Sequence, residues 1–484
     1  MRFRTTILLL LVLAGLGAYV YFIEYPQAER DVKKKTLFEF KADDATEVTL
    51  AYADAKIVLK KSGSEWRITD PLDVPADETT VKNLVSAVAD CEVKRELTDP
   101  SSDLSQYGLD KPFATVTVKL GGKELPAVLV GKNAPVGFST YIRRADDKKI
   151  VLTSSAFRSG MEKKVKDLRD KTIVNFADTD VQRLAITAAD KDLRLAQKGD
   201  TWSIEQPAAF AADGSTVRSF LSTLRSLRAV DFPDDNPSDL ALYGLDSPRL
   251  TITLYIGKDN AEKRILIGKE NDKKEIFVQG SGRPTIYTVS EWVYRDLNKS
   301  LGDFRDKTVL AFDRDKATAV DLHRQDGGHV RLVQGKDKKW SIEGGDGKPL
   351  ETAISQYVSD LHDLKGHEII ADSPADLAPF GLDRPLLKIT VLGEDGKPTG
   401  TALLGAREAA GKREYTGMAE GGPTVFLVRD YLFTRLDKQA KDFVEKPTPT
   451  PGGAATPAAN GDTAEEDEPL NEMLDEGEAL GEQD

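Results

Sequence analysis

The chain contains almost no cysteine: Cys91 is the only one among 484 residues. A single thiol excludes an intramolecular disulfide and a cluster of thiolate metal ligands. Cys91 ends an apolar helical pattern, so we expect a small core residue there. Histidine is scarce too, and its four copies all lie in the last third of the chain, at His323, His329, His362 and His367. We predict no catalytic residue, no metal site and no cofactor.

A surplus of basic residues is also missing. The formal net charge is −13, and residues 447–484 carry eleven acidic residues without Lys or Arg. The difference leaves only −2 on residues 1–446. No positive field is available for a phosphate backbone, which argues against nucleic acid as a partner. The sequence points to no particular small-molecule ligand either.

Against these absences stands a threefold repetition. Three tryptophans lie 136 and 138 residues apart, a Tyr/Phe-Gly-Leu-Asp-x-Pro phrase follows each of them, and a strand-ending glycine recurs every 137 residues. This period exceeds the ~20–50 residues of a solenoid repeat, so each copy can bury a core of its own. The repeated landmarks are Trp66, Trp202 and Trp340; Tyr107, Gly108 and Asp110; Tyr243, Gly244 and Asp246; Phe380, Gly381 and Asp383; and Gly131, Gly268 and Gly405.

Each copy combines alternating strand patterns with helical apolar spacing. Turn residues separate short β-prone runs, and each tryptophan shares a strand face with the isoleucine two residues later, which suggests that both point into the core. A helical stripe then recurs, for example at Val81, Leu84, Val85 and Val88, and a final helix carries Phe157, Met161, Val165 and Leu168 in copy one and Trp292, Val293, Leu297 and Leu301 in copy two. We predict an α+β fold of three tandem repeats, each a mostly antiparallel sheet with two helices, at residues 37–173, 174–309 and 310–446.

The repeated phrase reads as a structural turn. Its glycine suits a positive φ or a close approach, and its proline fixes an extended entry into the next strand. A functional site is the alternative, but the third copy has Phe380 in place of tyrosine and so lacks the hydroxyl.

Arginine marks the end of the first two copies. Arg169 and Arg305 lie in matching Asp-x-Arg-Asp-Lys-Thr segments, and the third copy, with no module after it, has Val444 instead. We therefore hypothesise that Arg169 and Arg305 hydrogen-bond across the joint to the next module, where a planar guanidinium suits bidentate contact. A solvated, charged helix end is the alternative interpretation.

The N-terminal segment predicts a membrane anchor. An uncharged apolar run covers residues 7–23, extended by threonines to 5–23, with Arg2 and Arg4 before it and Glu24 after it. That length is at the short limit for a span, and the flanking charges place the N-terminus inside. We assign residues 1–25 to a transmembrane helix and 26–36 to a linker. A cleaved signal peptide remains the alternative, although the small residues lie inside the run.

The last 38 residues have the composition of a disordered acidic tail, 447–484. Within it Leu470, Met473 and Leu474 have helical spacing and could fold onto a partner's groove. A purely solubilising tail is the alternative.

These landmarks resemble the bacterial domain of unknown function 4340 family over residues 37–446. The resemblance implies a single-span protein of the cytoplasmic (inner) membrane with extracytoplasmic repeats, considered beside ABC-type export or gliding-motility components, and it supplies no catalytic residue. We therefore expect a non-catalytic, membrane-anchored periplasmic spacer or binding protein, whose partners are envelope or transporter proteins. The alternatives are an envelope enzyme with a site in the third copy, built on its histidines, and a structural lattice component.

Overall fold

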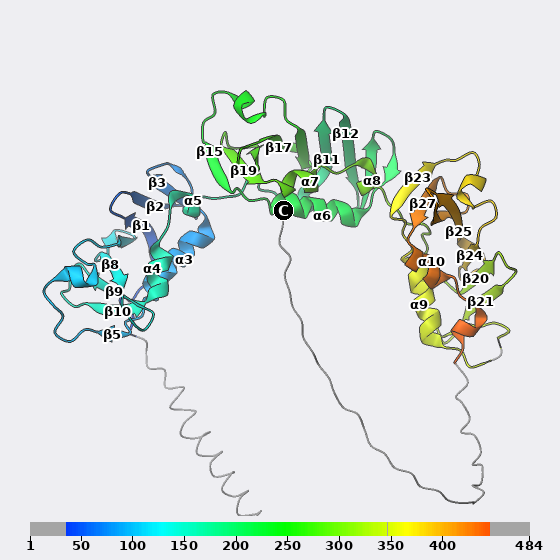
Figure 1. The fold of residues 1–484 in the computed structure, drawn as a ribbon, viewed down its shortest axis with the longest axis horizontal. Coiled ribbons are helices and arrows are strands. Elements are labelled where there is room, and N and C mark those ends of the chain that lie inside the picture. Colours follow the sequence, from blue (N-terminus) through cyan, green and yellow to red (C-terminus); the bar gives the residue numbers. More distant parts are fainter. Residues whose placement is uncertain (1–34, 346, 446–484) are drawn as a thin grey trace, which may run out of the picture. The chain divides into compact units, whose positions relative to one another are not determined.

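The structure is a computed structural model, and it describes residues 35–345 and 347–445. The chain divides into two compact units, Met1–Asp306 and Lys307–Asp484. The described part of the first unit holds two modules, each with its own sheet and core, and that of the second unit holds one (Figure 1).

The first module is built on a ten-stranded sheet. A long helix follows the fourth strand and two short helices close the module. Its elements are η2 (Ala42–Asp44), β1 (Ala45–Ala51), β2 (Lys56–Ser62), β3 (Glu65–Asp70), β4 (Val74–Pro75), α3 (Glu78–Ala89), β5 (Arg95–Glu96), η3 (Leu104–Tyr107), β6 (Ala114–Leu120), β7 (Lys123–Glu124), β8 (Val128–Asn133), β9 (Ser139–Arg144), β10 (Val151–Ser154), α4 (Ser155–Met161) and α5 (Val165–Leu168).

The second module repeats this order on a nine-stranded sheet. Its elements are η4 (Asp178–Asp180), β11 (Val181–Ala188), β12 (Lys191–Lys198), β13 (Thr201–Gln206), β14 (Phe210–Ala211), α6 (Gly214–Arg225), β15 (Asp231–Asp234), η5 (Leu240–Tyr243), β16 (Leu250–Ile256), β17 (Ala261–Glu270), β18 (Glu275–Gly280), β19 (Ile286–Ser290), α7 (Trp292–Leu297) and α8 (Leu301–Phe304).

The third module has an eight-stranded sheet, and a 3-10 helix takes the place of the last α-helix. Its elements are η6 (Arg314–Lys316), β20 (Ala319–Arg324), β21 (His329–Gln334), β22 (Trp340–Ile342), α9 (Glu351–His362), β23 (Glu368–Asp372), η7 (Ala378–Phe380), β24 (Leu387–Leu392), β25 (Pro398–Ala409), β26 (Lys412–Ala419), β27 (Thr424–Val428), α10 (Asp430–Leu436) and η8 (Ala440–Phe443).

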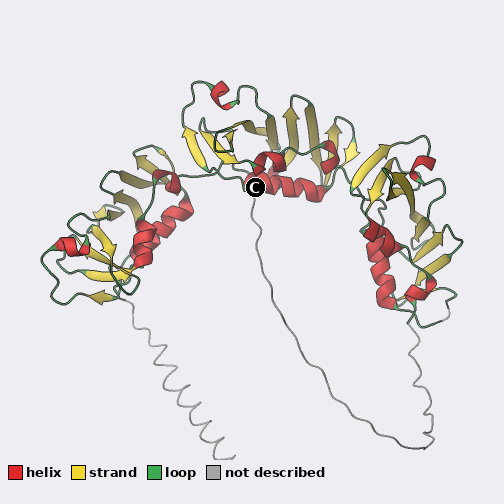
Figure 2. Ribbon diagram, in the orientation of Figure 1, coloured by secondary structure: helices red, strands yellow, loops and turns green. Residues whose placement is uncertain are grey.

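The three sheets share one topology. The main path of the first runs β4-β3-β2-β1-β6-β8-β9-β10-β5, and the second and third follow the same order. Consecutive strands pair antiparallel, while the strand after the long helix crosses to the far edge, as β5 does beside β10. In each module the α-helices lie on one face of the sheet (Figure 2). The predicted α+β class with mostly antiparallel sheets is therefore confirmed.

Each core lies between the long helix and the sheet. Along α3 the buried positions are the four predicted apolar residues and Ala89, and the carboxylate of Asp77 caps the first turn by accepting from the amide of Thr80. Trp66, Trp202 and Trp340 are all buried, at 6, 6 and 8 % exposure. A helix of this length is marginal alone, so its stability derives from packing this stripe against the sheet.

The prediction of a single closing helix in each of the first two copies is wrong. It is two short helices, α4 and α5 in the first module and α7 and α8 in the second. The amide of Lys164 donates to the carboxylate of Asp167, which starts a new helix at Val165 despite the continuous apolar spacing. Trp292, expected on the buried face, is 51 % exposed. The number of two helices per module is therefore too low for the first two copies.

A short lead-in segment packs each time against the module that it opens. Thr172 pairs with Arg228, and Ile173 and Val174 lie in the core of the second module. An added Cβ on Gly280 would overlap the carbonyl of Ile173, so this approach is tight. Thr36 with Glu92 and Thr308 with Lys365 form the matching bridges in the first and third modules. No flexible linker therefore separates the first module from the second.

No helix among the described residues is long and apolar enough to cross a membrane. The predicted anchor at residues 1–25 and the tail at 447–484, with Leu470, Met473 and Leu474, lie outside the described residues.

Candidate interaction sites

The repeated phrase and the periodic glycine meet in space. Tyr107 ends the 3-10 helix η3, and Gly108 follows in the left-handed conformation, with φ 64°. An added Cβ on Gly131 would overlap the carbonyl oxygen of Tyr107. Strand alternation places Gly131 opposite Val130, which belongs to the core, so the phrase covers the other face of the sheet.

The second and third modules make the same contact. Gly244 and Gly381 have φ 65°, Gly268 approaches the carbonyl of Tyr243, and Gly405 approaches that of Gly381. Leu109, Leu245 and Leu382, the third residues of the phrases, are buried. The aspartates of the phrases, Asp110, Asp246 and Asp383, are exposed.

The tyrosine hydroxyls of the phrase act differently from copy to copy. Tyr107 accepts a hydrogen bond from the amide of Ser101 at 2.9 Å, whereas Tyr243 donates to the carboxylate of Asp234 at 2.9 Å. This carboxylate raises the pKa of Tyr243. Phe380 has no hydroxyl, and its carbonyl accepts from Thr416. What repeats is the backbone contact.

Arg169 contacts the second module through its whole side chain. Its guanidinium donates to both carboxylate oxygens of Asp235, at 3.0 and 2.5 Å, and lies 3.8 Å from the ring centroid of Phe232. Only 8 % of the Arg169 side chain is exposed. The backbone of Arg169 pairs with Ala76 of the first module. This one residue therefore belongs to both modules and lies at their joint.

A second ion pair crosses the same joint. Arg283 donates to the carboxylate of Asp170 at 2.8 Å, and a cleft of about 700 Å³ lies beside it, with Trp66 and Arg228 in its lining. Arg305, at the position that corresponds to Arg169, pairs through its backbone with Ala212 and lies 3.8 Å from the ring centroid of Phe210.

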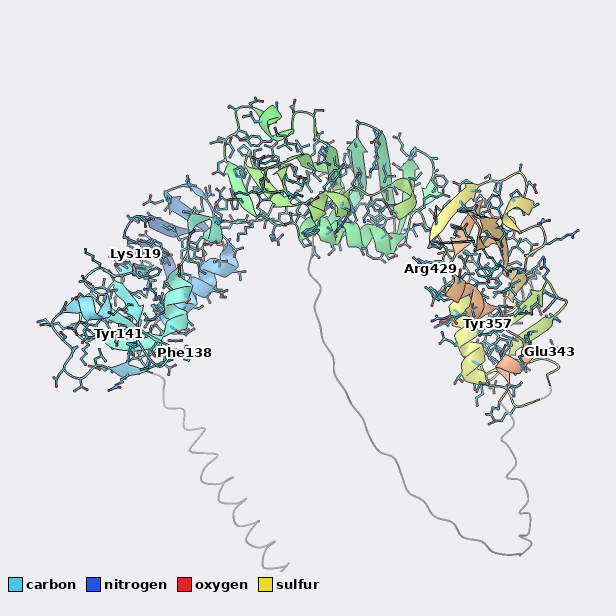
Figure 3. All side chains as sticks on the ribbon, in the orientation of Figure 1. Lys119, Phe138, Tyr141, Glu343, Tyr357 and Arg429 are labelled. Carbon is cyan, nitrogen blue, oxygen red and sulfur yellow. The ribbon has the colours of Figure 1, made fainter. Side chains whose placement is uncertain are left out.

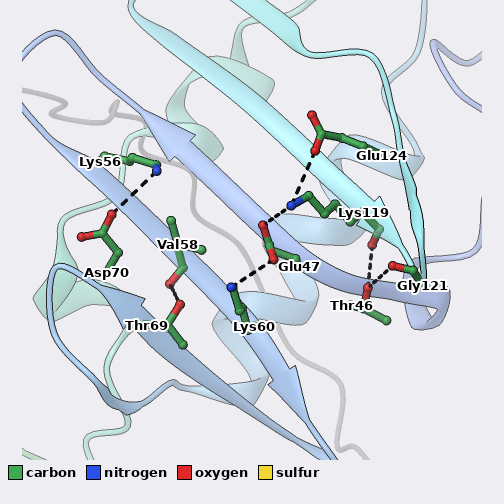
Figure 4. Close-up of polar contacts among 10 residues, drawn as sticks. All are labelled: Thr46, Glu47, Lys56, Val58, Lys60, Thr69, Asp70, Lys119, Gly121 and Glu124. Carbon is green, nitrogen blue, oxygen red and sulfur yellow. Dashed lines mark hydrogen bonds and ion pairs between the residues drawn. The ribbon is translucent and has the colours of Figure 1, made fainter.

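Sequence reasoning missed a cleft in the first module. It measures about 850 Å³ and lies where the β1–β2 hairpin meets the end of α4. Its apolar lining is Tyr52, Ile57, Pro71, Pro112, Phe113 and Val165, and its charged lining is Lys56, Lys111, Lys163, Lys164, Asp54, Asp70 and Glu162. Lys56 and Asp70 form an ion pair of 3.8 Å there (Figure 4).

The polar group that fastens this hairpin to the closing helix changes between modules. In the first, the hydroxyl of Tyr52 donates to the carbonyl of Met161 at 2.6 Å and accepts from the amide of Lys163 at 3.1 Å. In the second, Lys191 contacts Asn298, and in the third Arg324 pairs with Asp437. Alignment of the copies gives only a partial signal, because the positions that correspond to Tyr52 are Ala188 and Arg324, and the second module uses Lys191, three residues later.

The four histidines occupy separate elements of the third module. His323 and His329 stack across the β20–β21 hairpin with ring centroids 4.3 Å apart, His362 contacts Asp363 at the end of α9, and His367 bonds through its amide to Leu427. Among the described residues, no group of three or more His, Cys, Asp and Glu side chains could hold a metal ion.

Comparison with known proteins decides the family. Three segments, residues 66–206, 202–364 and 350–448, match the family model described as domain of unknown function DUF4340. The chain belongs to the DUF4340 family. The three overlapping matches confirm the three tandem copies expected from the sequence. The first two DUF4340 segments begin at Trp66 and Trp202, inside the structural modules, so the family match is out of phase with the folded cores.

Other comparisons add little to the family assignment. No curated protein matches the chain. Among solved structures, a DnaN sliding clamp (DNA polymerase III subunit beta) from Pseudomonas aeruginosa, bound to griselimycin, aligns with 82 % of this chain and 94 % of that chain. The identity is 6 % and the TM-score 0.12, and a likeness this low carries no argument.

Proposed function

We propose that this DUF4340 protein is a non-catalytic spacer or binding protein, anchored in the inner membrane by residues 5–23 with its modules in the periplasm. In this proposal it serves as an accessory component of an ABC-type transport or cell-envelope complex. The apolar N-terminal run and its flanking charges support the anchor and its orientation.

The main observation in favour of a non-catalytic role is that the modules share packing features and differ in their polar groups. Gly131 and its counterparts in the other modules lie against a carbonyl oxygen of the turn, and the three tryptophans are buried in the cores. The polar groups that join the first hairpin to the closing helices differ, as Tyr52, Lys191 and Arg324 illustrate. Turnover requires fixed chemical groups, whereas a spacer requires fixed packing, and the repeated features favour the spacer.

The joint supports the same proposal. A bidentate, stacked arginine such as Arg169 restricts the angle between consecutive modules more than a lysine would. The lead-in residues Ile173 and Val174 further limit the joint because they are part of the next core. A spacer that sets distance needs such restriction, whereas independent modules on flexible linkers do not.

Thiol labelling tests the placement of the modules. Cys91 is buried, and burial raises the pKa of its thiol to about 11, so the native protein offers almost no reactive thiolate. Ser64→Cys adds a thiol at an exposed turn. A membrane-impermeant maleimide should label this variant in intact cells whose outer membrane is permeabilised, and leave the wild type unlabelled. Labelling that requires rupture of the inner membrane would refute the periplasmic placement.

Crosslinking in native membranes tests the accessory role. With lysine-reactive crosslinkers and mass spectrometry, we expect links between the modules and subunits of a transporter or envelope complex. Links formed only between copies of this chain would favour the lattice component instead. The result separates these functions because a lattice component contacts mainly itself.

A further inference from the structure

The loop at residues 134–138, between β8 and β9 of the first module, exposes two large apolar side chains. Val136 is 82 % exposed and Phe138 is 89 % exposed, the two highest values among the exposed large hydrophobic residues of the described chain. Pro135 precedes them and Gly137 separates them. Single exposed apolar residues are ordinary, but two at the tip of one loop indicate a contact surface.

The loop holds these side chains outward at a conformational cost. Phe138 has φ 41°, an uncommon value for a bulky residue, and Gly137 beside it has φ 83°. Hydrogen bonds fix the backbone: Ala134 donates to Ser139, and Ser155 donates to the carbonyl of Phe138 at 3.0 Å. Lys274 and Ala410 in the corresponding loops of the other modules also have positive φ, 61° and 50°, so this backbone shape belongs to the hairpin. What is particular to the first module is the exposed aromatic side chain at this place.

The corresponding loops of the other two modules have no apolar side chains of this size at their tips. In the second module, β17 and β18 are joined by Asn271, Asp272, Lys273 and Lys274, and in the third, β25 and β26 are joined by Ala410 and Gly411. The fold therefore does not require an apolar tip at this position. Only the module that follows the predicted anchor carries one.

The tip lies at the end of the module where the described chain begins. The amide of Val93 donates to the carbonyl of Lys35, and the segment continues into β5, which pairs with β10. β10 ends at α4, where Ser155 bonds to Phe138. Lys35 and Phe138 are therefore separated by three strand spacings, about 15 Å. Figure 3 labels Phe138 at this end of the module.

Chain length and charge point to one occupant. Eleven residues, 24–34, separate the apolar run from Lys35, which limits the distance from membrane to module to about 40 Å. This end of the module also carries Lys35, Lys94, Arg95 and Lys149 against Glu92 and Glu96. Lys35 and Lys149 both pair with Glu96, and the four basic side chains still outnumber the two carboxylates. An excess of positive charge at the end that carries an apolar tip suits a bilayer that contains anionic lipids.

We propose that loop 134–138 is a membrane contact: Val136 and Phe138 enter the headgroup region of the bilayer that holds the anchor, and the basic side chains at this end approach anionic headgroups. The proposal rests on the membrane anchor of the proposed function. It makes the first module lie against the bilayer.

A fluorescent probe at the loop tests this contact in the full-length protein. Val136→Cys, labelled with an environment-sensitive dye, leaves Phe138 in place, and buried Cys91 stays unlabelled. The matched control is Lys273→Cys in the corresponding polar loop of the second module. In vesicles of phosphatidylethanolamine and phosphatidylglycerol, lipid-borne nitroxide should quench the probe at 136 roughly two-fold or more above the control. Adding Phe138→Ser to the labelled variant should remove most of that difference.

Vesicle flotation separates the two proposals. If the protein floats but its probe at 136 is quenched no more than the probe at 273, the loop contact is overturned and the anchor is kept. A probe shielded from water but not quenched by lipid indicates a protein partner or a second copy, and also overturns it. Protein that fails to float overturns the anchor and the contact together.

Discussion

At the scale of single residues, a strand glycine in each module lies against a carbonyl oxygen of the repeated turn. Gly131 and Gly268 leave no room for a Cβ beside the Tyr-Gly turn, and the left-handed Gly108 and Gly244 complete the fit from the other side. The lysines that follow, Lys132 and Lys269, make Gly-Lys pairs with these two glycines. The pairs are packing features, since the glycine is the residue that the fold constrains.

Gly131→Ala should lower the free energy of unfolding by about 1–3 kcal/mol, because the new methyl overlaps a backbone carbonyl that cannot move cheaply. Chemical denaturation of the full chain measures the change. Gly122→Ala is the matched control, since its Cβ would meet nothing within 4 Å. Equal effects of the two substitutions would contradict the packing argument.

Tyr52→Phe should destabilise the first module by about 1 kcal/mol. The substitution removes a hydroxyl that bonds both to Met161 and to Lys163 but keeps the edge contact between the ring and Phe113. Tyr255→Phe, on the strand β16, serves as a comparison. Thermal unfolding should show the loss for Tyr52 alone, and an unchanged midpoint would mean that the bonds are replaced by water.

At the scale of elements, the charges on the open face of the first sheet form a small network. Glu47 on β1 contacts Lys119 at 2.8 Å and Lys60 at 3.5 Å, and Lys119 also contacts Glu124 at 3.5 Å (Figure 4). The hydrogen bond from Lys119 is the main cause that lowers the pKa of Glu47 below its ordinary 4.5.

This lowered pKa predicts the sign of a pH effect. The stabilising contribution of Glu47 is fully present above pH 4.5 and disappears as the pH falls through the lower pKa of the folded state. Glu47→Gln should therefore be less stable than the wild type at pH 7, and the two should converge under acid. Denaturation between pH 7 and pH 3 tests this, and a difference that does not change with pH would exclude the network as its source.

The joint between the first two modules depends on Arg169. Arg169→Ala should increase hydrogen exchange at the amide of Ala229, which donates to Lys171 at the joint, by roughly ten-fold for a loss of about 1.4 kcal/mol. Arg194→Ala removes an exposed pair with Asp192 and should leave that amide unchanged. Equal protection in both variants would show that the lead-in segment alone holds the joint.

The sequence reveals some of these elements better than others. The period, the buried tryptophans and the stripe of α3 follow from spacing, because apolar periodicity reports burial directly. The break between α4 and α5 does not, because Asp167 starts a new helix without interrupting the apolar pattern. Arg169 shows at once as a repeated cation, but its partner Asp235 lies 66 residues away, and only the fold brings them together. The cleft beside Tyr52 forms from four separate segments and has no local signal.

At the scale of the whole molecule, the segments that match the family model begin and end at other residues than the folded modules do. Deletion of residues 173–308 would join Thr172 to Val309 at matching lead-in segments and keep the cores of the first and third modules intact. Deletion of residues 203–340 is slightly longer and joins the first strands of the second sheet to the remainder of the third.

We expect the first deletion variant to keep both remaining cores and to lose only what the contact of Arg169 with Asp235 contributes. The second should lose about 1–3 kcal/mol or more in its hybrid core, where side chains from two different packings meet. Denaturation followed by tryptophan fluorescence distinguishes them. Equal stability would mean that the modules are interchangeable at any point of the period.

The chain enters the first module beside β5 and leaves it beside β4, where Arg169 pairs with Ala76. These are opposite edges of a nine-strand path, about 40 Å apart at ordinary strand spacing. Tension applied through the backbone would therefore run across the strands and peel their hydrogen bonds one row after another, an unzipping geometry that yields at low force. A spacer of this kind would keep its length at rest and give way gradually only when it is pulled between two attachment points.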